Sequence, residues 1–360
     1  MKFIDFFAGI GGFRKGFELA GHKCVGFCEW DRFAAASYIS MHLLTDTQRE
    51  ELEKLSLQKR QKEILKEVYR NGEWYANDIR NVDAGSMPKS NCWCFGAPCQ
   101  DFSIAGKRAG LDGGRSSLVC EIFRLLEGQE EQNRPEWLIY ENVKGMFSSN
   151  RGLDYLSIVL EMDRLGYDIE WQNINSSWFV PQNRERIYTI GHLRTRGRAK
   201  ILPITAADGK NHLEEIGEKP SKLKMEGRIY GENGIMRTLG HGHALSQPYA
   251  GIKAVGTPWS TSITKSKSGE LFPVTLPNGV ICWCVWNKKR QSYLTVRKLT
   301  PKECFRLQGW SDDYFEKAAF VNSDSQLYKQ AGNGVTVDVV ETIGKKLLYY
   351  EVSAYEPEKL

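Results

Sequence analysis

The hydrophobic pattern of the first thirty residues predicts a strand, a tight turn, a helix and a second strand. Residues 2–7 form a short apolar and aromatic run that ends at a glycine-rich turn, Gly9-Ile10-Gly11-Gly12. We expect a helix over residues 13–20 and a second buried strand over residues 22–30. Further strands are expected at 91–95, 137–140, 168–174 and 186–191, with helices at 117–127 and 153–165. This alternation is typical of an α/β fold with a doubly wound, mostly parallel sheet.

Two segments interrupt the alternation and suggest how the chain divides. Residues 45–70 are rich in Gln, Glu, Lys, Leu and Arg, which indicates one or two solvated helices inserted into the fold. From residue 194 to residue 294, Gly, Pro, Ser and basic residues replace the regular alternation. The helical pattern then returns, with Thr300 as the cap of a helix that begins at Pro301. We therefore predict a first domain at 1–193, a smaller inserted domain at 194–296, and a return to the first domain at 297–360.

Composition narrows the class of protein. Hydrophobic residues make up 41% and charged residues 26% of the chain, which favours a packed, water-soluble protein. No segment approaches the ~18 apolar residues that a membrane span requires, and the first residues lack the layout of a signal peptide. The nine cysteines are an odd number, and the spacing of the two Cys-Trp-Cys triplets is too short for a usual zinc site. We expect buried strand thiols, no metal ion, and a cytoplasmic monomer.

The distribution of charge says more than the net charge of +5. Residues 194–300 contain 18 Lys and Arg against 7 Asp and Glu, whereas the rest of the chain contains 31 against 37. A basic segment within an acidic chain suggests a surface for a polyanion. A solvated basic face without a partner fits the charge count equally well.

The glycine-rich turn predicts a site for an adenosine-bearing cofactor. Glycines after a strand let backbone amides approach a ligand, and Glu29, 20 residues after Gly9, would hold a ribose diol at the end of the next strand. Nicotinamide, flavin and S-adenosylmethionine sites share this arrangement. Asp78 could reach an adenine amine, although its own surroundings in the sequence suit a loop or cap equally.

Three further groups could carry chemistry. Cys99 follows Pro98 just beyond an expected strand, where a thiolate could act as a nucleophile, and the glycine-rich residues 105–117 after it are typical of a mobile flap. A buried structural cysteine fits the same local sequence. Glu141 lies just past the end of the next expected strand and would face the same edge of the sheet. Arg184 and Arg186 would project from one face of an extended segment.

Taken together, these motifs resemble the cytosine-C5 DNA methyltransferase family of bacterial or phage type. The resemblance covers nearly the whole chain except residues 45–70 and much of the basic segment. The matching stretches, in family order, are 7–12, Glu29-Trp30, Asp78-Ile79, 96–103, Glu141-Asn142-Val143, 182–186, 297–309 and 330–335. Two positions depart from the usual family pattern, Ala97 and Gly334, and neither removes a reacting group.

The resemblance implies an enzyme that moves a methyl group from S-adenosylmethionine to carbon-5 of a flipped-out cytosine in duplex DNA. Cys99 would attack carbon-6, Glu141 would bond ring nitrogen 3 and the amine, Arg186 would support the ring carbonyl, and Arg184 would orient Cys99 or the ring. The residues implied to line the cofactor site are Phe7, Gly9, Ile10, Gly11, Gly12, Glu29, Trp30, Asp78, Ile79, Pro98 and Asn333. Those implied to contact DNA are Ser103, Arg237, Thr238 and Leu239.

Three other functions remain open from the sequence. A dinucleotide-dependent oxidoreductase would explain the glycine turn and Glu29 but would leave Cys99 and Glu141 without a task. A tRNA cytosine methyltransferase would share the fold, yet its variable segment is usually shorter. A non-catalytic DNA-binding regulator would not need both Cys99 and Glu141. For a DNA methyltransferase, the sequence leaves open whether a separately encoded restriction endonuclease is a partner or whether the enzyme acts without one.

Overall fold

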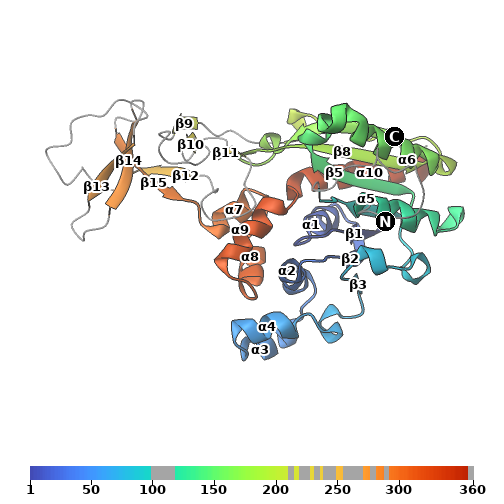
Figure 1. Ribbon diagram of the computed structural model, residues 1–360, viewed down its shortest axis with the longest axis horizontal. Coiled ribbons are helices and arrows are strands. Elements are labelled where there is room, and N and C mark those ends of the chain that lie inside the picture. Colours follow the sequence, from blue (N-terminus) through green and yellow to red (C-terminus); the bar gives the residue numbers. More distant parts are fainter. Residues whose placement is uncertain are drawn as a thin grey trace.

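In the computed structural model, the chain folds around two β-sheets that lie toward opposite ends of its long axis (Figure 1). The structure describes residues 1–98, 118–209 and 292–355, together with six short strands between residues 215 and 287. The larger sheet is built from residues 2–193, and the smaller sheet is built from residues 215–298.

The larger sheet has the strand order β3-β2-β1-β4-β5-β8-β6. Neighbouring strands from β3 to β5 pair in parallel, while β8 runs antiparallel to both β5 and β6. This arrangement confirms the predicted doubly wound, mostly parallel sheet. The bounds are β1 (Lys2–Phe6), β2 (Lys23–Cys28), β3 (Trp74–Ala76), β4 (Cys92–Phe95), β5 (Trp137–Val143), β6 (Tyr167–Asn175) and β8 (Glu185–Leu193).

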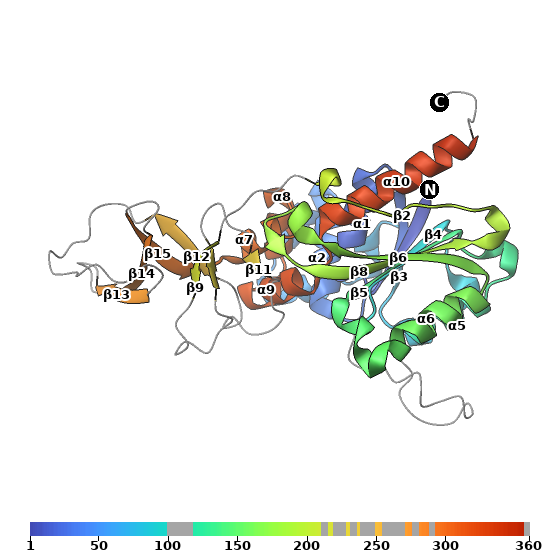
Figure 2. The same cartoon turned by 90° about the horizontal axis from the view of Figure 1, so that it is seen from above.

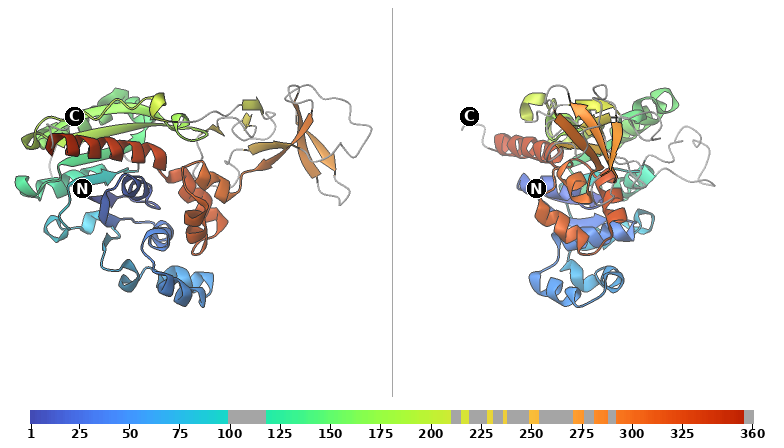
Figure 3. Two further views of the ribbon diagram at one scale, coloured as in Figure 1. Left: turned by 180° about the vertical axis from the view of Figure 1, so that it is seen from behind. Right: turned by 90° about the vertical axis from the view of Figure 1, so that its left-hand side faces the viewer.

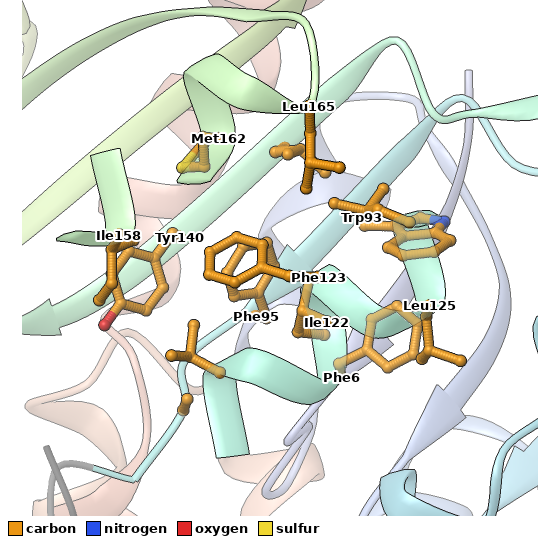
Figure 4. Close-up of a cluster of buried hydrophobic side chains, with 14 of the residues drawn as sticks. Phe6, Trp93, Phe95, Ile122, Phe123, Leu125, Tyr140, Ile158, Met162 and Leu165 are labelled. Carbon is orange, nitrogen blue, oxygen red and sulfur yellow. The ribbon is translucent and has the colours of Figure 1, made fainter. Parts of the chain in front are cut away.

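Helices cover both faces of this sheet (Figure 2). One face carries α1 (Gly12–Leu19) and α10 (Val337–Tyr355), and the other carries α5 (Leu118–Glu127) and α6 (Leu153–Arg164). The central strands are therefore buried on both sides, which is why they read in the sequence as near-continuous apolar runs. Figure 4 shows the cluster beneath α5 and α6, where the Phe95 and Tyr140 rings stack with centroids 5.2 Å apart.

The first helix, α1, and the last helix, α10, pack closely against each other on one face of the sheet. A Cβ atom placed on Gly16 of α1 would lie 2.6 Å from Val340 Cγ1 of α10, and one on Gly344 of α10 would lie 2.8 Å from Ala20 Cβ. The Gly344 carbonyl is also 2.9 Å from His22 Nε2. Two glycines thus let the C-terminal helix approach the backbone of the N-terminal one.

Residues 45–70 form two largely solvated helices, as the sequence predicts. They form α3 (Asp46–Glu53), α4 (Leu57–Glu63) and a 3-10 turn, after α2 (Arg32–His42). Leu52 and Ile64 are fully buried, and the Arg60 guanidinium lies 3.9 Å from the Phe320 ring centroid and donates a hydrogen bond to the Phe320 carbonyl (2.5 Å). The expected helices are confirmed, and Leu52, Ile64 and Arg60 dock them onto the rest of the chain.

After the smaller sheet the chain returns through α7 (Pro301–Arg306), α8 (Asp312–Ala319) and α9 (Asp324–Asn333), which lie between the two sheets (Figures 1 and 3). The predicted cap of α7 is confirmed. Thr300 Oγ1 accepts a hydrogen bond from the Glu303 amide (3.3 Å), and the Glu303 carboxylate accepts one from the Thr300 amide (2.7 Å). This reciprocal pairing is a capping box.

The smaller sheet has the order β13-β14-β15-β12-β10-β9. A separate two-residue strand, β11 (Met236–Arg237), pairs in parallel with β7 (Gln182–Asn183), next to the start of β8. The predicted domain limits stay predictions. The bounds are β9 (Glu215–Glu218), β10 (Arg228–Tyr230), β12 (Tyr249–Lys253), β13 (Leu271–Thr275), β14 (Ile281–Asn287) and β15 (Ser292–Lys298).

Two details of the larger sheet differ from the sequence-based expectation. β5 was expected to end at Tyr140 but continues to Val143, because β8 supplies hydrogen-bonding partners beyond the point where β4 ends. β3 was not expected at all, since it is three residues long, half-buried, and preceded by a charged segment. Its presence places Asp78 just after a strand end.

The cysteines of the first triplet and of β2 lie inside the sheet, as expected for strand thiols. Cys92 and Cys94 are fully buried with their sulfur atoms 3.8 Å apart. Burial raises the pKa of Cys24 and of Cys28 to about 12, so these thiols stay protonated near neutral pH. No disulfide joins the seven cysteines whose side chains the structure describes. Among the described residues, no helix is both long enough and apolar enough to cross a membrane.

The close contact of α1 with α10 predicts the effect of a minimal substitution. Gly16→Ala should lower the free energy of unfolding by about 1–3 kcal/mol, because the new methyl group would overlap Val340 and the Glu341 amide. Alanine has the higher helix propensity, so propensity alone would predict the opposite sign. Gly145→Ala is the matched control, since its Cβ would meet its nearest neighbour, Val143 Cγ2, at an ordinary 3.8 Å. Urea denaturation of both variants checks this, and an unchanged or raised stability of Gly16→Ala would contradict it.

Candidate active site

The glycine-rich turn after β1 is a compact loop with an unusual backbone. Phe7, Gly9 and Gly11 all have positive φ angles of 54°, 57° and 85°. For Phe7 this left-handed conformation carries a side-chain penalty, of a kind that tends to occur at functional sites. The loop is closed by a hydrogen bond from the Gly11 amide to the Ala8 carbonyl (2.8 Å) and tied to β2 by one from the Ala8 amide to the Cys28 carbonyl (3.0 Å).

Glu29 lies against this loop, as the spacing predicted. Its two carboxylate oxygens accept hydrogen bonds from the Gly9 amide (2.7 Å) and the Asp31 amide (2.6 Å). Burial raises the pKa of Glu29 to about 7, although the two amides act in the opposite direction. The carboxylate is therefore held in a fixed orientation at the carboxyl end of β2, where it can accept further hydrogen bonds from a polyhydroxylated ligand.

An exposed aromatic ring and a second acid complete this side of the site. Trp30, directly after Glu29, is 68% exposed. Asp78 follows β3 and forms an ion pair with Arg80 (2.8 Å), which lowers the pKa of Asp78. The Arg80 guanidinium also lies 4.8 Å from the centroid of the Trp30 ring. Ile79, in contrast, is buried in the core.

The glycine-rich loop is held in place by buried residues that the sequence pattern did not identify. The Ile10 side chain is buried in a cluster whose other members come mainly from α7, α8 and α9, so Ile10 contributes its backbone rather than its side chain to the loop surface. His42 Nε2 lies 2.9 Å from the Ile10 carbonyl, and burial holds the pKa of His42 well below its usual range. A Cβ on Gly12 would lie 2.6 Å from Val335 Cγ2, which leaves glycine as the residue that fits.

The second half of the site begins at the end of β4. A Cβ placed on Gly96 would lie 3.1 Å from Glu141 Oε2, so the segment after β4 runs directly past this carboxylate. The side-chain Nδ2 of Asn142 donates hydrogen bonds to the Ala97 carbonyl (3.3 Å) and to the Tyr140 hydroxyl (2.6 Å). Ala97 is buried and Pro98 is exposed. The predicted residues Cys99, Ser103, Thr238 and Leu239 lie outside the described residues, as do residues 105–117.

Glu141 is a buried carboxylate beside an arginine. It was expected just past a strand end, but it lies within β5, opposite Tyr188 of β8. Glu141 is 9% exposed, and its Oε1 atom is 3.1 Å from Arg186 Nε. The geometry of that ion pair is poor for a hydrogen bond, and among the described residues no group donates one to Oε1. Such an atom is costly to bury unless a ligand satisfies it.

Arg184 occupies a different position from Arg186. It lies in the break between β7 and β8, is almost fully buried, and donates hydrogen bonds to the carbonyls of Gly332 (3.1 Å) and Gly334 (2.8 Å). Burial and the nearby Arg186 lower the pKa of Arg184 to about 9. Asn333, the residue between the two glycines, is exposed. The guanidinium of Arg184 therefore fixes the backbone on both sides of Asn333.

A buried polar network supports the same region. Ser176 Oγ and Thr336 Oγ1 are 2.8 Å apart, Thr336 Oγ1 donates to Gln308 Oε1 (3.0 Å), and Gln308 Nε2 donates to the Ala331 carbonyl (2.8 Å). All three side chains are essentially inaccessible to solvent. Gln308 and Thr336 lie in or beside stretches that the sequence singled out, but nothing in their spacing indicated that they would bond to each other.

The carboxyl edge of the sheet thus carries two adjoining halves. The first offers a constrained glycine loop, a carboxylate aligned by amides, and an exposed indole, which suits an adenosine-bearing ligand. The second offers a buried carboxylate with an oxygen open to a donor and a guanidinium beside it. The chain segment that leads to Cys99 runs between them. This arrangement suits the transfer of a group from the first ligand to a planar polar substrate held in the second half.

Comparisons with known proteins agree with this geometry. A profile described as C-5 cytosine-specific DNA methylase matches residues 1–65 and 54–349. An orphan methyltransferase, M.SPRI of Bacillus phage SPR, is 26% identical, and the match covers 97% of this chain and 98% of the phage protein. A type II methyltransferase, M.DsaV of Dactylococcopsis salina, is 28% identical over 97% of this chain and 86% of its own.

Solved structures show the same fold. The Dnmt2 methyltransferase of S. pombe superposes with a TM-score of 0.59 at 16% identity and covers 98% of this chain and 99% of its own. The methyltransferase EhMeth of Entamoeba histolytica superposes with a TM-score of 0.58 at 15% identity and covers 98% of both chains. The family match extends over nearly the whole chain and includes the site described above. The chain therefore belongs to the C-5 cytosine-specific DNA methylase family, and it is a DNA cytosine-C5 methyltransferase.

Proposed function

We propose that this enzyme transfers a methyl group from S-adenosylmethionine to carbon-5 of a flipped-out cytosine, within a specific sequence of duplex DNA, through a covalent adduct of Cys99. The observation that carries the proposal is the Glu141 carboxylate. It is buried, it lies 3.1 Å from Arg186, and it borders the segment that leads to Cys99. A cytosine ring presents a donor to such a carboxylate and a carbonyl to such a guanidinium.

The residues of the first half fit S-adenosylmethionine, which supplies an electrophilic methyl group when bound. Glu29, aligned by the Gly9 and Asp31 amides, would accept hydrogen bonds from the ribose hydroxyls. Trp30 would lie against the adenine, and Asp78 would accept a hydrogen bond from its amine. The remaining residues that we assign to this site are Phe7, Gly9, Ile10, Gly11, Gly12, Ile79, Pro98 and Asn333.

The reaction needs a nucleophile because carbon-5 of cytosine is itself a poor one. Addition of the Cys99 thiolate to carbon-6 turns the ring into an enamine-like species, which Glu141 stabilises by sharing a proton with ring nitrogen 3. Carbon-5 would then bond to the methyl carbon of S-adenosylmethionine while the bond from that carbon to the sulfonium sulfur breaks, which leaves S-adenosylhomocysteine. A base removes the proton of carbon-5, and the electron pair expels Cys99 as a thiolate. Both the aromatic ring and the thiolate are restored.

Arg186 and Arg184 have different proposed roles. Arg186, next to Glu141, would donate to the ring carbonyl. For Arg184 the family resemblance implies contact with Cys99 or the ring, yet both of its terminal nitrogens bond to the carbonyls of Gly332 and Gly334. We therefore assign Arg184 a positioning role, in which it holds Asn333 at the cofactor side of the site.

DNA would enter from the side of the smaller sheet. The pairing of β11 with β7 brings Arg237 to the same register as Asn183, next to Arg184. We propose that Arg237, Thr238 and Leu239 contact the DNA bases, that Ser103 contacts the DNA near the target cytosine, and that the basic excess of residues 194–300 faces phosphates. Flipping the cytosine out of the duplex costs a few kcal/mol, which these contacts would offset.

The comparisons extend this proposal to partners. Because relatives such as M.DsaV are named type II methyltransferases, we propose that a separately encoded restriction endonuclease accompanies this enzyme. We further propose that it acts as a monomer in the cytoplasm.

Cys99→Ser tests the covalent step. The variant should lose more than about 99% of methylation activity because a serine hydroxyl is a far weaker nucleophile at neutral pH than a partly ionised thiol, whereas cofactor binding should persist. With DNA that contains 5-fluorocytosine, the wild-type protein should form an adduct stable to denaturing electrophoresis, and Cys99→Ser should form none. An RNA strand of the same sequence is the control for substrate class. Methylation by the serine variant at near wild-type rate would exclude the covalent mechanism.

Glu141→Gln tests the proton-sharing role. Glutamine keeps the shape of the side chain but neither carries the charge nor transfers a proton, so kcat should fall by about 10²- to 10⁴-fold. The affinity for S-adenosylhomocysteine and the unfolding midpoint should stay close to the wild-type values, because the cofactor half of the site is unchanged. A kcat within about twofold of wild type would remove Glu141 from the reaction.

The raised pKa of Glu29 predicts a pH dependence of cofactor binding. Ribose hydroxyls bond best to the ionised carboxylate, so binding must expel a proton below a pKa of about 7. The dissociation constant of S-adenosylhomocysteine should be flat above about pH 8 and rise by about tenfold per unit below about pH 6. Glu29→Gln should bind more weakly at high pH and should lose this dependence, which separates Glu29 from the titration of the ligand. Calorimetry that gives parallel profiles for both proteins would contradict the assignment.

A further inference from the structure

The N–H groups of Arg80 donate hydrogen bonds to both carboxylate oxygens of Asp78. The carboxylate Oδ1 accepts hydrogen bonds from the Arg80 amide (3.1 Å) and from Arg80 Nε (2.9 Å). The Oδ2 atom accepts bonds from Arg80 Nε (3.2 Å) and from Arg80 Nη2 (2.8 Å). An ionised carboxylate offers about four lone-pair sites. Three N–H groups of Arg80 therefore occupy most of the acceptor sites of Asp78, since the Nε–H group is shared between the two oxygens, and two of the three groups belong to the guanidinium.

The same guanidinium also covers Trp30. Its central carbon lies 4.8 Å from the centroid of the indole ring, within the range of a cation–π contact. The Trp30 ring is 68% exposed, and the Arg80 side chain is 52% exposed. Arg80 therefore joins, at the protein surface, the two side chains that come from the ends of β2 and β3.

We propose that Arg80 is a surrogate ligand of the adenine subsite, which sets the affinity of the enzyme for its cofactor. The inference rests on the proposed function, in which Trp30 and Asp78 receive the adenine ring and its amine. Arg80 satisfies both groups when the site holds no cofactor, and it must leave them before adenine can bind. Because Arg80 is largely exposed, its guanidinium returns to water when it leaves, and the displacement is readily reversible.

A consequence concerns product release. S-adenosylmethionine and S-adenosylhomocysteine carry the same adenosyl group, so competition by Arg80 weakens the binding of both by the same factor. In S-adenosylmethionine the ribose separates the methyl-bearing sulfur from the adenine, which is the part that Trp30 and Asp78 would contact. Arg80 is thus expected to change the KM for the cofactor and the dissociation constant of the product together, without lowering the rate of the chemical step.

Arg80→Met is the direct test, since methionine keeps an unbranched apolar stem and removes the guanidinium. In calorimetry the variant should bind S-adenosylhomocysteine about three- to tenfold more tightly than wild type, because an exposed ion pair and a cation–π contact no longer have to be broken. The KM for S-adenosylmethionine should fall by the same factor, and single-turnover methylation should keep its rate. Arg80→Lys, which retains the charge but cannot form the bidentate pair, should fall between the two.

A double-mutant cycle with Asp78→Asn assigns the effect to the pair. Asparagine still offers an oxygen to the adenine amine but cannot form the ion pair, so Arg80→Met should gain clearly less affinity in that background. Weaker or unchanged binding by Arg80→Met in the wild-type background would overturn the proposal, and so would an equal gain with Asp78→Asn. Failure of the underlying site has a different signature, because Trp30→Ala would then leave the affinity for S-adenosylhomocysteine unchanged. Thermal unfolding of each variant confirms that the comparison is between folded proteins.

Discussion

The β8 strand runs antiparallel between β5 and β6, and its pairing with β5 continues three residues past the last pairing of β4 with β5, at Tyr140. Glu141 lies beyond the last residue of β5 that pairs with β4. Pairing with β8 nevertheless keeps Glu141 in regular strand geometry. It also places Arg186 opposite Val143, within reach of the Glu141 carboxylate. In an open α/β sheet, ligands gather at the carboxyl ends of the parallel strands. The reversed strand adds guanidinium groups to that edge, which parallel strands alone would not deliver there.

Residues of the C-terminal part of the chain, which follows the smaller sheet, hold this edge of the larger sheet in place. Arg184 holds the backbone around Asn333, the network of Ser176, Thr336 and Gln308 ties that loop to the segment before β7, and Val335 packs against Gly12. These contacts are buried, so breaking any one of them exposes an unsatisfied polar group or a void. The cofactor loop and the carboxylate half of the site are therefore held together at one edge by a C-terminal segment, and Val335 of that segment lies more than 300 positions after Gly12 in the sequence.

The local features of the fold were predictable from the sequence, and the long-range ones were not. The glycine turn, the position of Glu29 and the Thr300 cap depend on residues close together in the chain, and the structure places all three as expected. The end of β5 and the partners of Arg184 depend on segments that lie far away in the sequence, and a one-sequence pattern carries no information about such pairings. The partners of Leu52 and Ile64 could not be predicted for the same reason, because Phe27, Tyr38 and Val321 of their cluster lie elsewhere in the chain. Cys99 is proposed as the nucleophile from its motif alone, and it lies outside the described residues, so this assignment stays a prediction.

Bisulfite sequencing of DNA shows whether this enzyme methylates carbon-5 of cytosine, because methylated cytosines resist conversion. Genomic DNA from cells that express the wild-type chain should contain cytosines that resist conversion, all within one short recurring sequence. DNA from cells that express an equal amount of the Cys99→Ser variant should convert completely. Complete conversion in the presence of folded wild-type protein, or the same protection by both proteins, would contradict the account.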